Sequence, residues 1–153
     1  KHSLFVFGDL QCSSQVGNVS KFNNFDLICP TERESRIALA TKDEGVEWVA
    51  RTLMRKTNSR NLVMKLGGEG FIAYETEPDG FISRQHFPAL SINPVDVSGA
   101  GDSLLAALSV GLCSGSTLMQ SSAIGAGMSS LAVQQVGNIP VSYQQLKNYL
   151  NKI

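Results

Sequence analysis

A chain of 153 residues that is 42% hydrophobic and 17% charged has the composition of a folded globular protein and excludes intrinsic disorder. Its 13 basic residues balance 13 acidic residues, so no overall field favours nucleic acid or an acidic membrane surface as a partner. No apolar run reaches the length of a membrane span, and the N-terminal residues lack the pattern of a signal peptide. The three cysteines form no C-x-x-C pair, which favours reduced thiols in a cytoplasmic protein and argues against a metal site among them.

Two apolar runs near the N-terminus have the length of strands. The run at 4–7 predicts a buried parallel strand, and the run at 26–29, closed by Pro30, predicts the next one. The Ser- and Asn-rich stretch between them, 12–24, predicts a loop with a short helix.

Two capping boxes of the form T-x-x-E predict two helix starts, one at Thr31 and one at Thr41. After the second box, apolar residues recur at i, i+3, i+4, i+7 and i+8, which is one face of a helix. These residues are Val46, Val49, Ala50, Leu53 and Met54.

The middle of the chain predicts further strands. Strands at 62–66 and 71–74 flank glycines that predict a hairpin turn, and a third strand is expected at 81–87. An extended segment is also expected at 89–94, as a strand that precedes the glycine turn.

Three helices are predicted in the last third of the chain. The first, 99–113, is apolar nearly all round and is therefore expected to be buried. The second, 117–136, ends at Gly137 as a C-cap, and the third begins at Ser142. Strands that alternate with helices predict a single α/β domain, a three-layer α-β-α sandwich with a mostly parallel sheet.

The stretch 96–103 has the sequence D-V-S-G-A-G-D-S and opens the first of these helices. A helix N-terminus presents unpaired N–H groups and the positive end of its dipole, which together form an anion site. Because Gly99, Ala100 and Gly101 carry little or no side chain, the backbone can approach a phosphate closely. Repulsion makes Asp102 a poor phosphate ligand, so its better use is to take a proton from an attacking hydroxyl.

The same spacing also fits a plain glycine-rich turn. In that interpretation Asp96 or Ser98 caps the turn, and the negative charge of Asp102 is merely favourable near the positive end of the helix dipole. Spacing alone does not choose between the two, because short glycine patterns are weak evidence.

The wording of this turn resembles the D-T-x-G-A-G-D signature near the C-terminus of ribokinase-type (PfkB) carbohydrate kinases. The resemblance implies that the G-A-G backbone is the anion hole for the transferred phosphoryl group and that Asp102 is the catalytic base. Asp96 and Ser98, at the start of the signature, then belong to the cofactor site, although Ser98 stands where Thr is common.

The sequence P-T-E-R-E at 30–34 resembles the P-N-x-x-E motif of the same kinases. The resemblance implies that Glu34 helps to organise Mg²⁺ through water and that Thr31, where Asn is usual, lies near the phosphates. A capping box explains both residues without a metal, so this alternative stays open.

The sequence K-L-G-G-E-G at 65–70 resembles the family's T-L-G-x-x-G, which borders the nucleotide. Gly67 could let the backbone approach ATP, and Lys65, in place of a frequent Thr, could reach a phosphate. An ordinary glycine hairpin accounts for the glycines equally well.

Weaker signals complete the pattern. The small-residue stretch 123–130 falls where the family packs against adenine, and 9–15 resembles sugar kinases related to the kinase half of ADP-heptose synthase. Asp9 itself is expected to form a turn, and no catalytic role is assigned to Ser13 or Ser14. Neither His2 nor His86 has a partner at metal or triad spacing, so both are expected to be structural or surface residues.

The resemblance covers nearly the whole chain in order and implies the C-terminal, nucleotide-binding half of such a kinase. The N-terminal half, which supplies most sugar contacts and the lid, is expected to be missing. The implied reaction is ATP-dependent phosphoryl transfer to a hydroxyl of a sugar or sugar phosphate, with Mg²⁺ and a monovalent cation site beside the turn. We expect ATP binding with little or no turnover, and association with the missing half or as a homodimer.

Two other functions compete with this interpretation. Thr31 and Lys65, which depart from the family pattern, leave room for a non-catalytic nucleotide-binding or regulatory association module. A dinucleotide oxidoreductase is disfavoured, because no G-x-G-x-x-G follows the first predicted strand.

Overall fold

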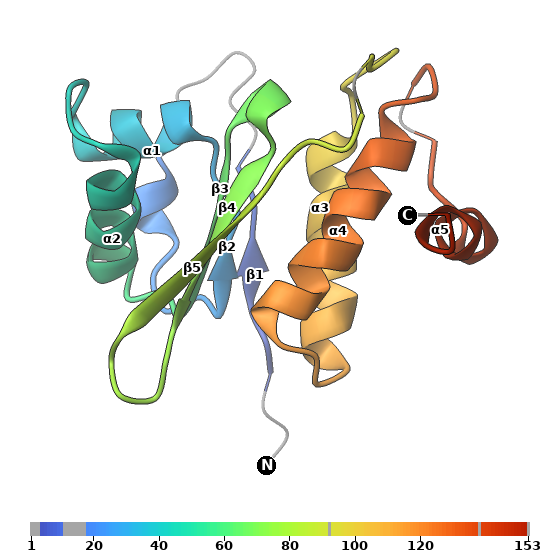
Figure 1. Ribbon diagram of the computed structural model, residues 1–153. Coiled ribbons are helices and arrows are strands. Elements are labelled where there is room, and N and C mark those ends of the chain that lie inside the picture. Colours follow the sequence, from blue (N-terminus) through green and yellow to red (C-terminus); the bar gives the residue numbers. More distant parts are fainter. Residues whose placement is uncertain (1–3, 11–17, 92, 138, 153) are drawn as a thin grey trace. The chain divides into compact units, whose positions relative to one another are not determined.

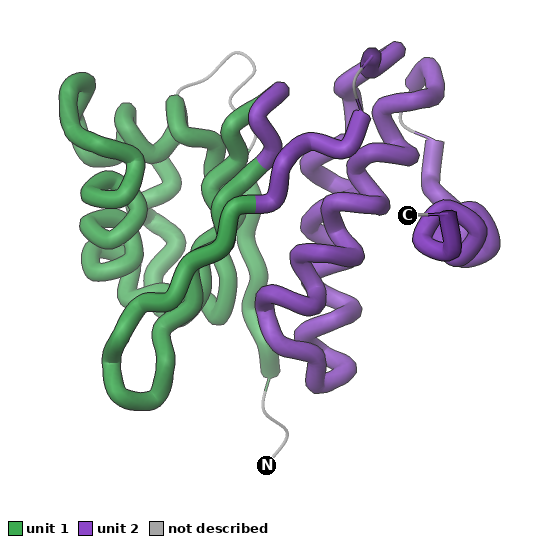
Figure 2. Tube along the Cα trace, viewed as in Figure 1, with its two compact units in different colours: residues 1–67, 71–86 green, residues 68–70, 87–153 purple. Residues whose placement is uncertain are grey.

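The computed structural model describes residues 4–10, 18–91, 93–137 and 139–152 (Figure 1). The chain divides into two compact units, which Figure 2 colours separately. Unit 1 comprises residues 1–67 and 71–86, and unit 2 comprises residues 68–70 and 87–153. His2 and most of the stretch around Cys12, Ser13 and Ser14 lie outside the described residues, so the predictions made for them stay predictions.

Unit 1 is built on a five-stranded sheet with the order β1-β2-β3-β4-β5. The strands are β1 (Phe7–Gly8), β2 (Leu27–Ile28), β3 (Asn61–Lys65), β4 (Phe71–Thr76) and β5 (Ile82–Phe87). β1, β2 and β3 run parallel, whereas β4 runs antiparallel to β3. The short 3-10 turn η2 (Gly67–Glu69) connects β3 to β4, which confirms the predicted glycine hairpin.

Two helices, α1 (Glu32–Leu39) and α2 (Val46–Thr57), cover one face of this sheet (Figure 1). The predicted apolar stripe of α2 supplies Val49, Ala50, Leu53 and Met54 to a buried cluster with strand residues that include Leu62 and Met64. Burial of each valine, leucine or methionine side chain in this cluster contributes about 1.5–3 kcal/mol. The 3-10 helix η1 (Val19–Lys21) lies in the predicted loop between β1 and β2.

The prediction for the first strand was wrong in its extent. β1 contains only Phe7 and Gly8, and Leu4 and Phe5 are 86% and 50% exposed. Because β1 is the outer strand of the sheet, it has a paired neighbour on one side only, and the residues before it lie at the sheet's edge.

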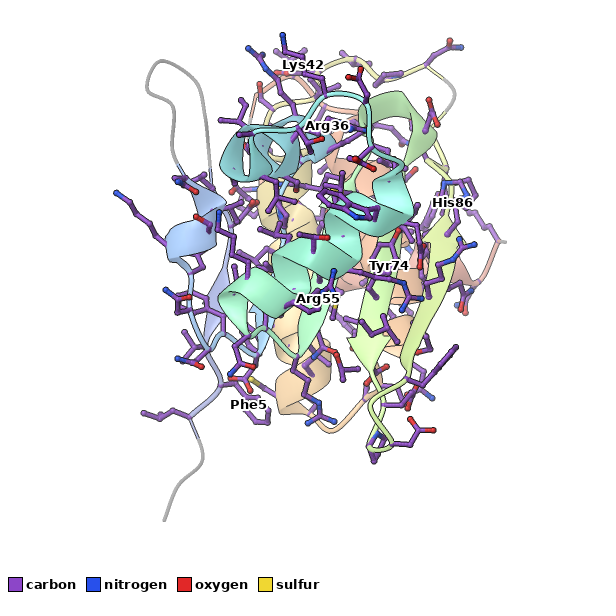
Figure 3. The ribbon with its side chains drawn as sticks, turned by 90° about the vertical axis from the view of Figure 1, so that its left-hand side faces the viewer. Phe5, Arg36, Lys42, Arg55, Tyr74 and His86 are labelled. Atoms are coloured by element: carbon purple, nitrogen blue, oxygen red, sulfur yellow. The ribbon has the colours of Figure 1, made fainter. Side chains whose placement is uncertain are left out.

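The two predicted capping boxes had different outcomes. Thr31 begins α1 with both bonds of the box, whereas α2 begins at Gly45 without a side-chain cap, so the prediction at Thr41 was wrong. The reason is local. α1 ends at Ala40 in the left-handed conformation (φ 53°), and the Arg36 guanidinium donates to the carbonyls of residues 42 and 44. Residues 41–44 are thereby held as a turn beside Arg36 (Figure 3).

Unit 2 contains three helices, α3 (Ala100–Cys113), α4 (Leu118–Ala132) and α5 (Tyr143–Leu150). α3 and α4 pack closely because glycines face larger residues. Gly111 lies against Ser121, and a Cβ at Gly125 would lie 2.6 Å from Cδ1 of Leu104. α5 begins with the predicted capping box of Ser142 and Gln145.

Three predictions in unit 2 were corrected by the structure. The described residues of 89–94 form no strand. α3 buries only Leu104 and Leu108, and Val110 is 68% exposed, so the helix is not buried on all sides as predicted. α4 ends four residues earlier than expected, because the backbone amide of Gly137 bonds to Asp96 instead of closing the helix. Within the described residues no helix is both long and apolar enough to cross a membrane.

Candidate functional site

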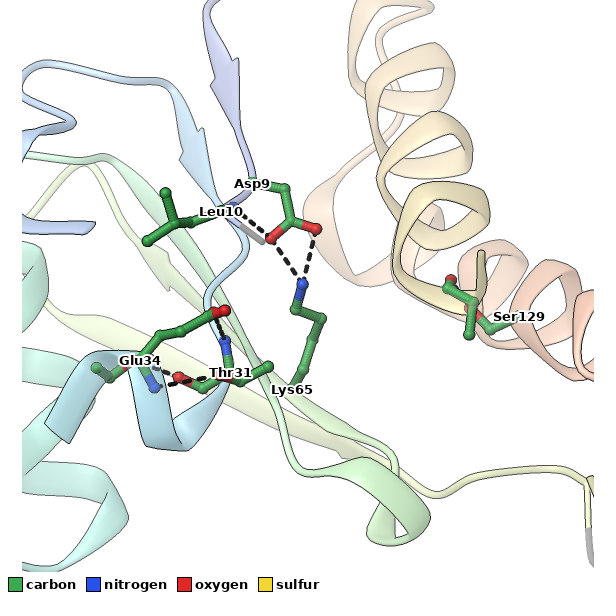
Figure 4. A network of polar contacts seen from close by, with 8 residues as sticks. Asp9, Leu10, Thr31, Glu34, Lys65 and Ser129 are labelled. Carbon is green, nitrogen blue, oxygen red and sulfur yellow. Dashed lines mark hydrogen bonds and ion pairs between the residues drawn. The ribbon is translucent and has the colours of Figure 1, made fainter. Parts of the chain in front are cut away.

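The carboxyl ends of the three parallel strands carry the candidate residues of unit 1. Asp9 directly follows β1, Thr31 comes shortly after β2, and Lys65 is the last residue of β3. Because these strands are parallel, their carboxyl ends share one edge of the sheet, the usual place for ligands in α/β folds. Thr31 and Lys65 also pair directly through a parallel β-bridge (Figure 4).

Thr31 and Glu34 form a reciprocal pair at the start of α1. The Glu34 amide donates to Oγ1 of Thr31 at 3.1 Å, and the Thr31 amide donates to Oε2 of Glu34 at 2.7 Å (Figure 4). Glu34 is only 5% exposed, so its carboxylate is fixed in the first helical turn, where the dipole favours negative charge.

A carboxylate oxygen is the kind of ligand that Mg²⁺ prefers, and in this respect Glu34 fits the predicted role. The described part of the chain contains no group of three His, Cys, Asp or Glu side chains that could hold a metal. A magnesium ion at Glu34 would therefore need phosphate and water oxygens to complete its coordination.

Lys65 has a partner that sequence reasoning missed. Its Nζ atom lies 2.6 and 2.7 Å from the two carboxylate oxygens of Asp9, and the Leu10 amide donates to the same carboxylate at 2.8 Å (Figure 4). The side chains of Lys65 and Asp9 are 17% and 16% exposed. The sequence offered one signal for this pair: an acidic residue, Asp9, and a basic residue, Lys65, lie at the ends of two strands of the same parallel sheet.

Cys29 lies at the end of β2, close to this ion pair, and is buried. Burial raises the pKa of the Cys29 thiol, and the negative charge of Asp9 raises it further. The thiol therefore stays protonated and unreactive, as expected for a structural cysteine.

Gly67 begins the turn between β3 and β4 and adopts a positive φ of 63°. An added Cβ at Gly67 would meet nothing within 4 Å, and the residue is exposed. Its backbone is open to a ligand, as the proposed approach to a nucleotide requires.

In unit 2 the glycine turn begins α3 as predicted. Gly99 is the N-cap with a φ of 77°, a left-handed conformation that favours glycine, and no side chain caps the helix. Neither Asp96 nor Ser98 caps α3 itself, but the Asp96 carboxylate accepts the Ser98 amide within the preceding turn, so the plain-turn interpretation stays open. Ala100, Gly101 and Asp102 form the first turn, whose amides have no acceptor inside the helix. The Ala100 amide donates to the Val97 carbonyl in the preceding loop at 3.3 Å.

Asp96 stabilises the loop before α3. Its carboxylate accepts the Ser98 amide and the Gly137 amide, each at 2.9 Å. These two bonds, that from Ser98 first, lower the pKa of Asp96, because they favour the ionised form. A second contact comes from α4, where the Ser129 hydroxyl donates to the Ala100 carbonyl at 3.1 Å.

The structure thus gathers the predicted residues into two groups. Thr31, Glu34, Lys65 and Gly67 belong to unit 1, and residues 96–102 belong to unit 2. Asp9 and Ser129, one in each unit, contact these groups without having been predicted to do so.

Residues 12–145 match the pfkB family of carbohydrate kinases. The chain belongs to this family. The match includes every residue of the candidate site except Asp9.

The curated relatives in this family include bifunctional HldE proteins at low identity. HldE of Syntrophotalea carbinolica is 25% identical over 130 residues, which cover 83% of this chain and 26% of that protein. HldE of Desulfatibacillum aliphaticivorans is 27% identical over 134 residues, which cover 86% of this chain and 27% of that protein. The chain therefore spans about a quarter of the length of these relatives.

Solved structures with the same fold cover more of the chain. Ribokinase of Thermotoga maritima aligns with a TM-score of 0.79 and 23% identity over 96% of this chain and 49% of the ribokinase. Arabidopsis thaliana ribokinase, complexed with ribose and ATP, aligns with a TM-score of 0.79 and 18% identity over 96% of this chain and 47% of that chain. Phosphofructokinase-2 of Escherichia coli, in complex with potassium, aligns with a TM-score of 0.73 and 18% identity over 86% of this chain and 42% of that chain. These likenesses confirm the predicted ribokinase-like α/β fold.

Proposed function

We propose that this chain is the C-terminal, ATP-binding part of a carbohydrate kinase that transfers a phosphoryl group to a hydroxyl of a sugar or sugar phosphate. The observation that carries the proposal is the uncapped N-terminus of α3, which presents the G-A-G-D sequence of a pfkB family member. A heptose-kinase-like acceptor is proposed from the resemblance of residues 9–15 to sugar kinases related to the kinase half of ADP-heptose synthase.

The geometry of the turn supports the roles proposed for its residues. The amides of Gly99, Ala100 and Gly101 would stabilise the charge that develops on the transferred phosphoryl group. Asp102, exposed in the first turn of α3, would take the proton of the attacking hydroxyl. Asp96 and Ser98 would serve the same site by shaping the loop that precedes the turn.

The residues of unit 1 would serve the nucleotide and its metal. Glu34 would hold Mg²⁺ through water, and Mg²⁺ would neutralise phosphate charge. Thr31 and Lys65 would lie near the phosphates, and the open backbone of Gly67 would border the nucleotide. A monovalent cation would be held beside the turn, largely by backbone carbonyl oxygens.

The substrate half is proposed to be absent from this chain, which aligns with 42–49% of the structural neighbours. We expect ATP binding with little or no turnover by the chain alone. Cys29 and Cys113 are both free thiols, which accords with a cytoplasmic protein.

The proposal is tested by calorimetric titration of the chain with Mg²⁺ and a non-hydrolysable ATP analogue. We expect saturable binding by the wild type and its loss in Gly101→Val, whose side chain would block the turn. Circular dichroism of the variant controls for folding. Binding that persists in folded Gly101→Val would show that the turn is not part of the ATP site. Robust sugar phosphorylation by the chain alone would refute the proposal that the substrate-binding half is absent from it.

A second candidate, a non-catalytic nucleotide-binding or regulatory module, is favoured by one observation. Lys65 is neutralised by Asp9 and Thr31 is used as a helix cap, so neither needs a nucleotide to explain it. The discriminating experiment is Asp102→Asn in the full-length protein that contains this chain. Unchanged phosphorylation there would favour the module over the kinase mechanism.

A further inference from the structure

The phosphate-binding turn of unit 2, residues 96–102, is attached to the C-terminal end of α4. The Val133 carbonyl accepts the amides of Val95 and Asp96 at 2.8 and 3.2 Å. The Asp96 carboxylate in turn accepts the Gly137 amide. The start of the turn is therefore fixed by the residues that end and follow α4.

The other end of the turn is fixed by a side chain. The Ser129 hydroxyl donates to the carbonyl of Ala100, the first residue of α3, at 3.1 Å. That carbonyl is also the helical acceptor for the amide four residues later, so it has a partner without Ser129. The contact from Ser129 is an additional bond, made by one helix to the first turn of another.

Close packing of the two helices makes this bond possible. Gly125 lies against Leu104, one turn further along α3 and one turn back along α4. Gly111 lies against Ser121 at the opposite end of the pair. The antiparallel register that these glycines set brings Ser129 opposite Ala100.

The consequence concerns the next residue. The Ala100 carbonyl and the Gly101 amide belong to one planar peptide unit, in which C=O and N–H point in opposite directions. A hydroxyl that fixes the Ala100 carbonyl therefore also fixes the direction of the Gly101 N–H. Donation to the carbonyl polarises the same peptide unit, which makes the Gly101 N–H a stronger donor to an anion.

We infer that Ser129 is a positioning residue that orients and polarises the Gly101 amide for the phosphoryl group. The inference rests on the proposed function, because that function gives the amide its ligand. Ser129 itself need not touch the nucleotide. Its effect is transmitted through the Ala100–Gly101 peptide unit.

The test compares three variants of the chain. Ser129→Ala removes the hydroxyl, and Ser129→Thr restores it. Ser130→Ala is the matched control, because the neighbouring hydroxyl of α4 is directed to the Tyr149 hydroxyl at 3.1 Å and not to the Ala100 carbonyl. The measurements are the ¹H–¹⁵N resonance of Gly101 without ligand and the affinity for Mg²⁺ with a non-hydrolysable ATP analogue.

We expect the Gly101 resonance to move in Ser129→Ala and to stay in place in Ser130→Ala. The affinity for the analogue should fall roughly two- to tenfold in Ser129→Ala, the effect of one hydrogen bond, and return in Ser129→Thr. A Gly101 resonance that moves equally in both alanine variants, or an affinity that Ser129→Ala leaves unchanged, would overturn the inference.

Failure of the proposed function gives a different result. If the wild-type Gly101 amide does not respond to saturating analogue, the turn is not a phosphate site, and Ser129 holds only a helix start. The inference is then overturned together with the function. If the wild type binds the analogue and Ser129→Ala binds it equally well, only the inference is overturned.

Discussion

The Nζ atom of Lys65 lies within 2.7 Å of both carboxylate oxygens of Asp9, although the two residues are 56 positions apart in the chain. The pair links the end of β1 to the end of β3, with β2 between them in the sheet. Both side chains are largely withdrawn from water, so each charge depends on the other. A phosphate that binds Lys65 would have to compete with Asp9.

Lys65→Met should lower the free energy of unfolding by about 1–3 kcal/mol, because it leaves the Asp9 carboxylate poorly solvated and without its cation. Urea denaturation of the variant and the wild type measures the difference. Lys147→Met, at an exposed position of α5, is the control and should change stability little.

The double variant Asp9→Asn/Lys65→Met tests whether the loss comes from the uncompensated charge. It should be more stable than Lys65→Met alone, because the Asp9 carboxylate that had lost its cation is also removed. Equal stability of Lys65→Met and the wild type would show that the ion pair contributes nothing to the fold.

Gly99 and Gly115 flank α3 and both adopt a positive φ, 77° and 86°. Alanine at either position should cost roughly 1–2 kcal/mol of stability, because L residues are strained in this conformation. Only Gly99→Ala should also weaken binding of the ATP analogue, since only Gly99 belongs to the turn that is proposed to bind phosphate. Chemical denaturation and calorimetry of both variants check this, and similar affinities in the two variants would count against the turn.

Local signals explain which elements were predictable from the sequence. The Thr31 box and the Ser142 box each specify both partners within four residues, and both helices begin as predicted. The Thr41 box has the same letters, yet the contacts of Arg36 with residues 42 and 44 hold that segment as a turn. A pattern of four residues cannot report a competing bond from the preceding helix.

The candidate site shows the same division. The glycine turn and its helix were predicted because Gly99, Gly101 and Asp102 are adjacent in sequence. The bonds of Asp9 to Lys65 and of Ser129 to the turn join positions 56 and 29 residues apart. Such pairs depend on strand order and helix packing, which a single sequence does not encode as a local pattern.

Asp96 should make stability depend on acid pH. Its pKa is lowered in the folded state by the amides of Ser98 and Gly137, whereas in the unfolded chain it is about 3.9. The stabilisation is therefore complete above the unfolded value and is lost as the pH falls through the folded one. Asp96→Asn should flatten the fall in stability below about pH 4, measured by urea denaturation at each pH.

The control for this prediction is Asp43→Asn, which removes an exposed carboxylate from the turn before α2. Its acid profile should follow that of the wild type. If Asp96→Asn also follows the wild type, the two amide bonds do not favour the ionised carboxylate.

Tyr74 should make stability depend on alkaline pH in the opposite sense. It lies fully buried on β4 (Figure 3), and burial, assisted by the charge of Glu47, raises its pKa to about 12. The unfolded chain loses this proton near pH 10, well before the folded chain does. Stability should therefore fall as the pH rises from about 10 to about 12, because only the unfolded state gains from ionisation.

Tyr74→Phe removes this dependence while it keeps the aromatic ring. Its cost at neutral pH should be small, because the Tyr74 hydroxyl has no hydrogen-bond partner among the described residues. Denaturation at pH 7 and between pH 10 and 12 measures both effects, with Tyr143→Phe as the control at a tyrosine that is 77% exposed. An alkaline fall in stability that is the same in Tyr74→Phe and the wild type would assign the effect to another group.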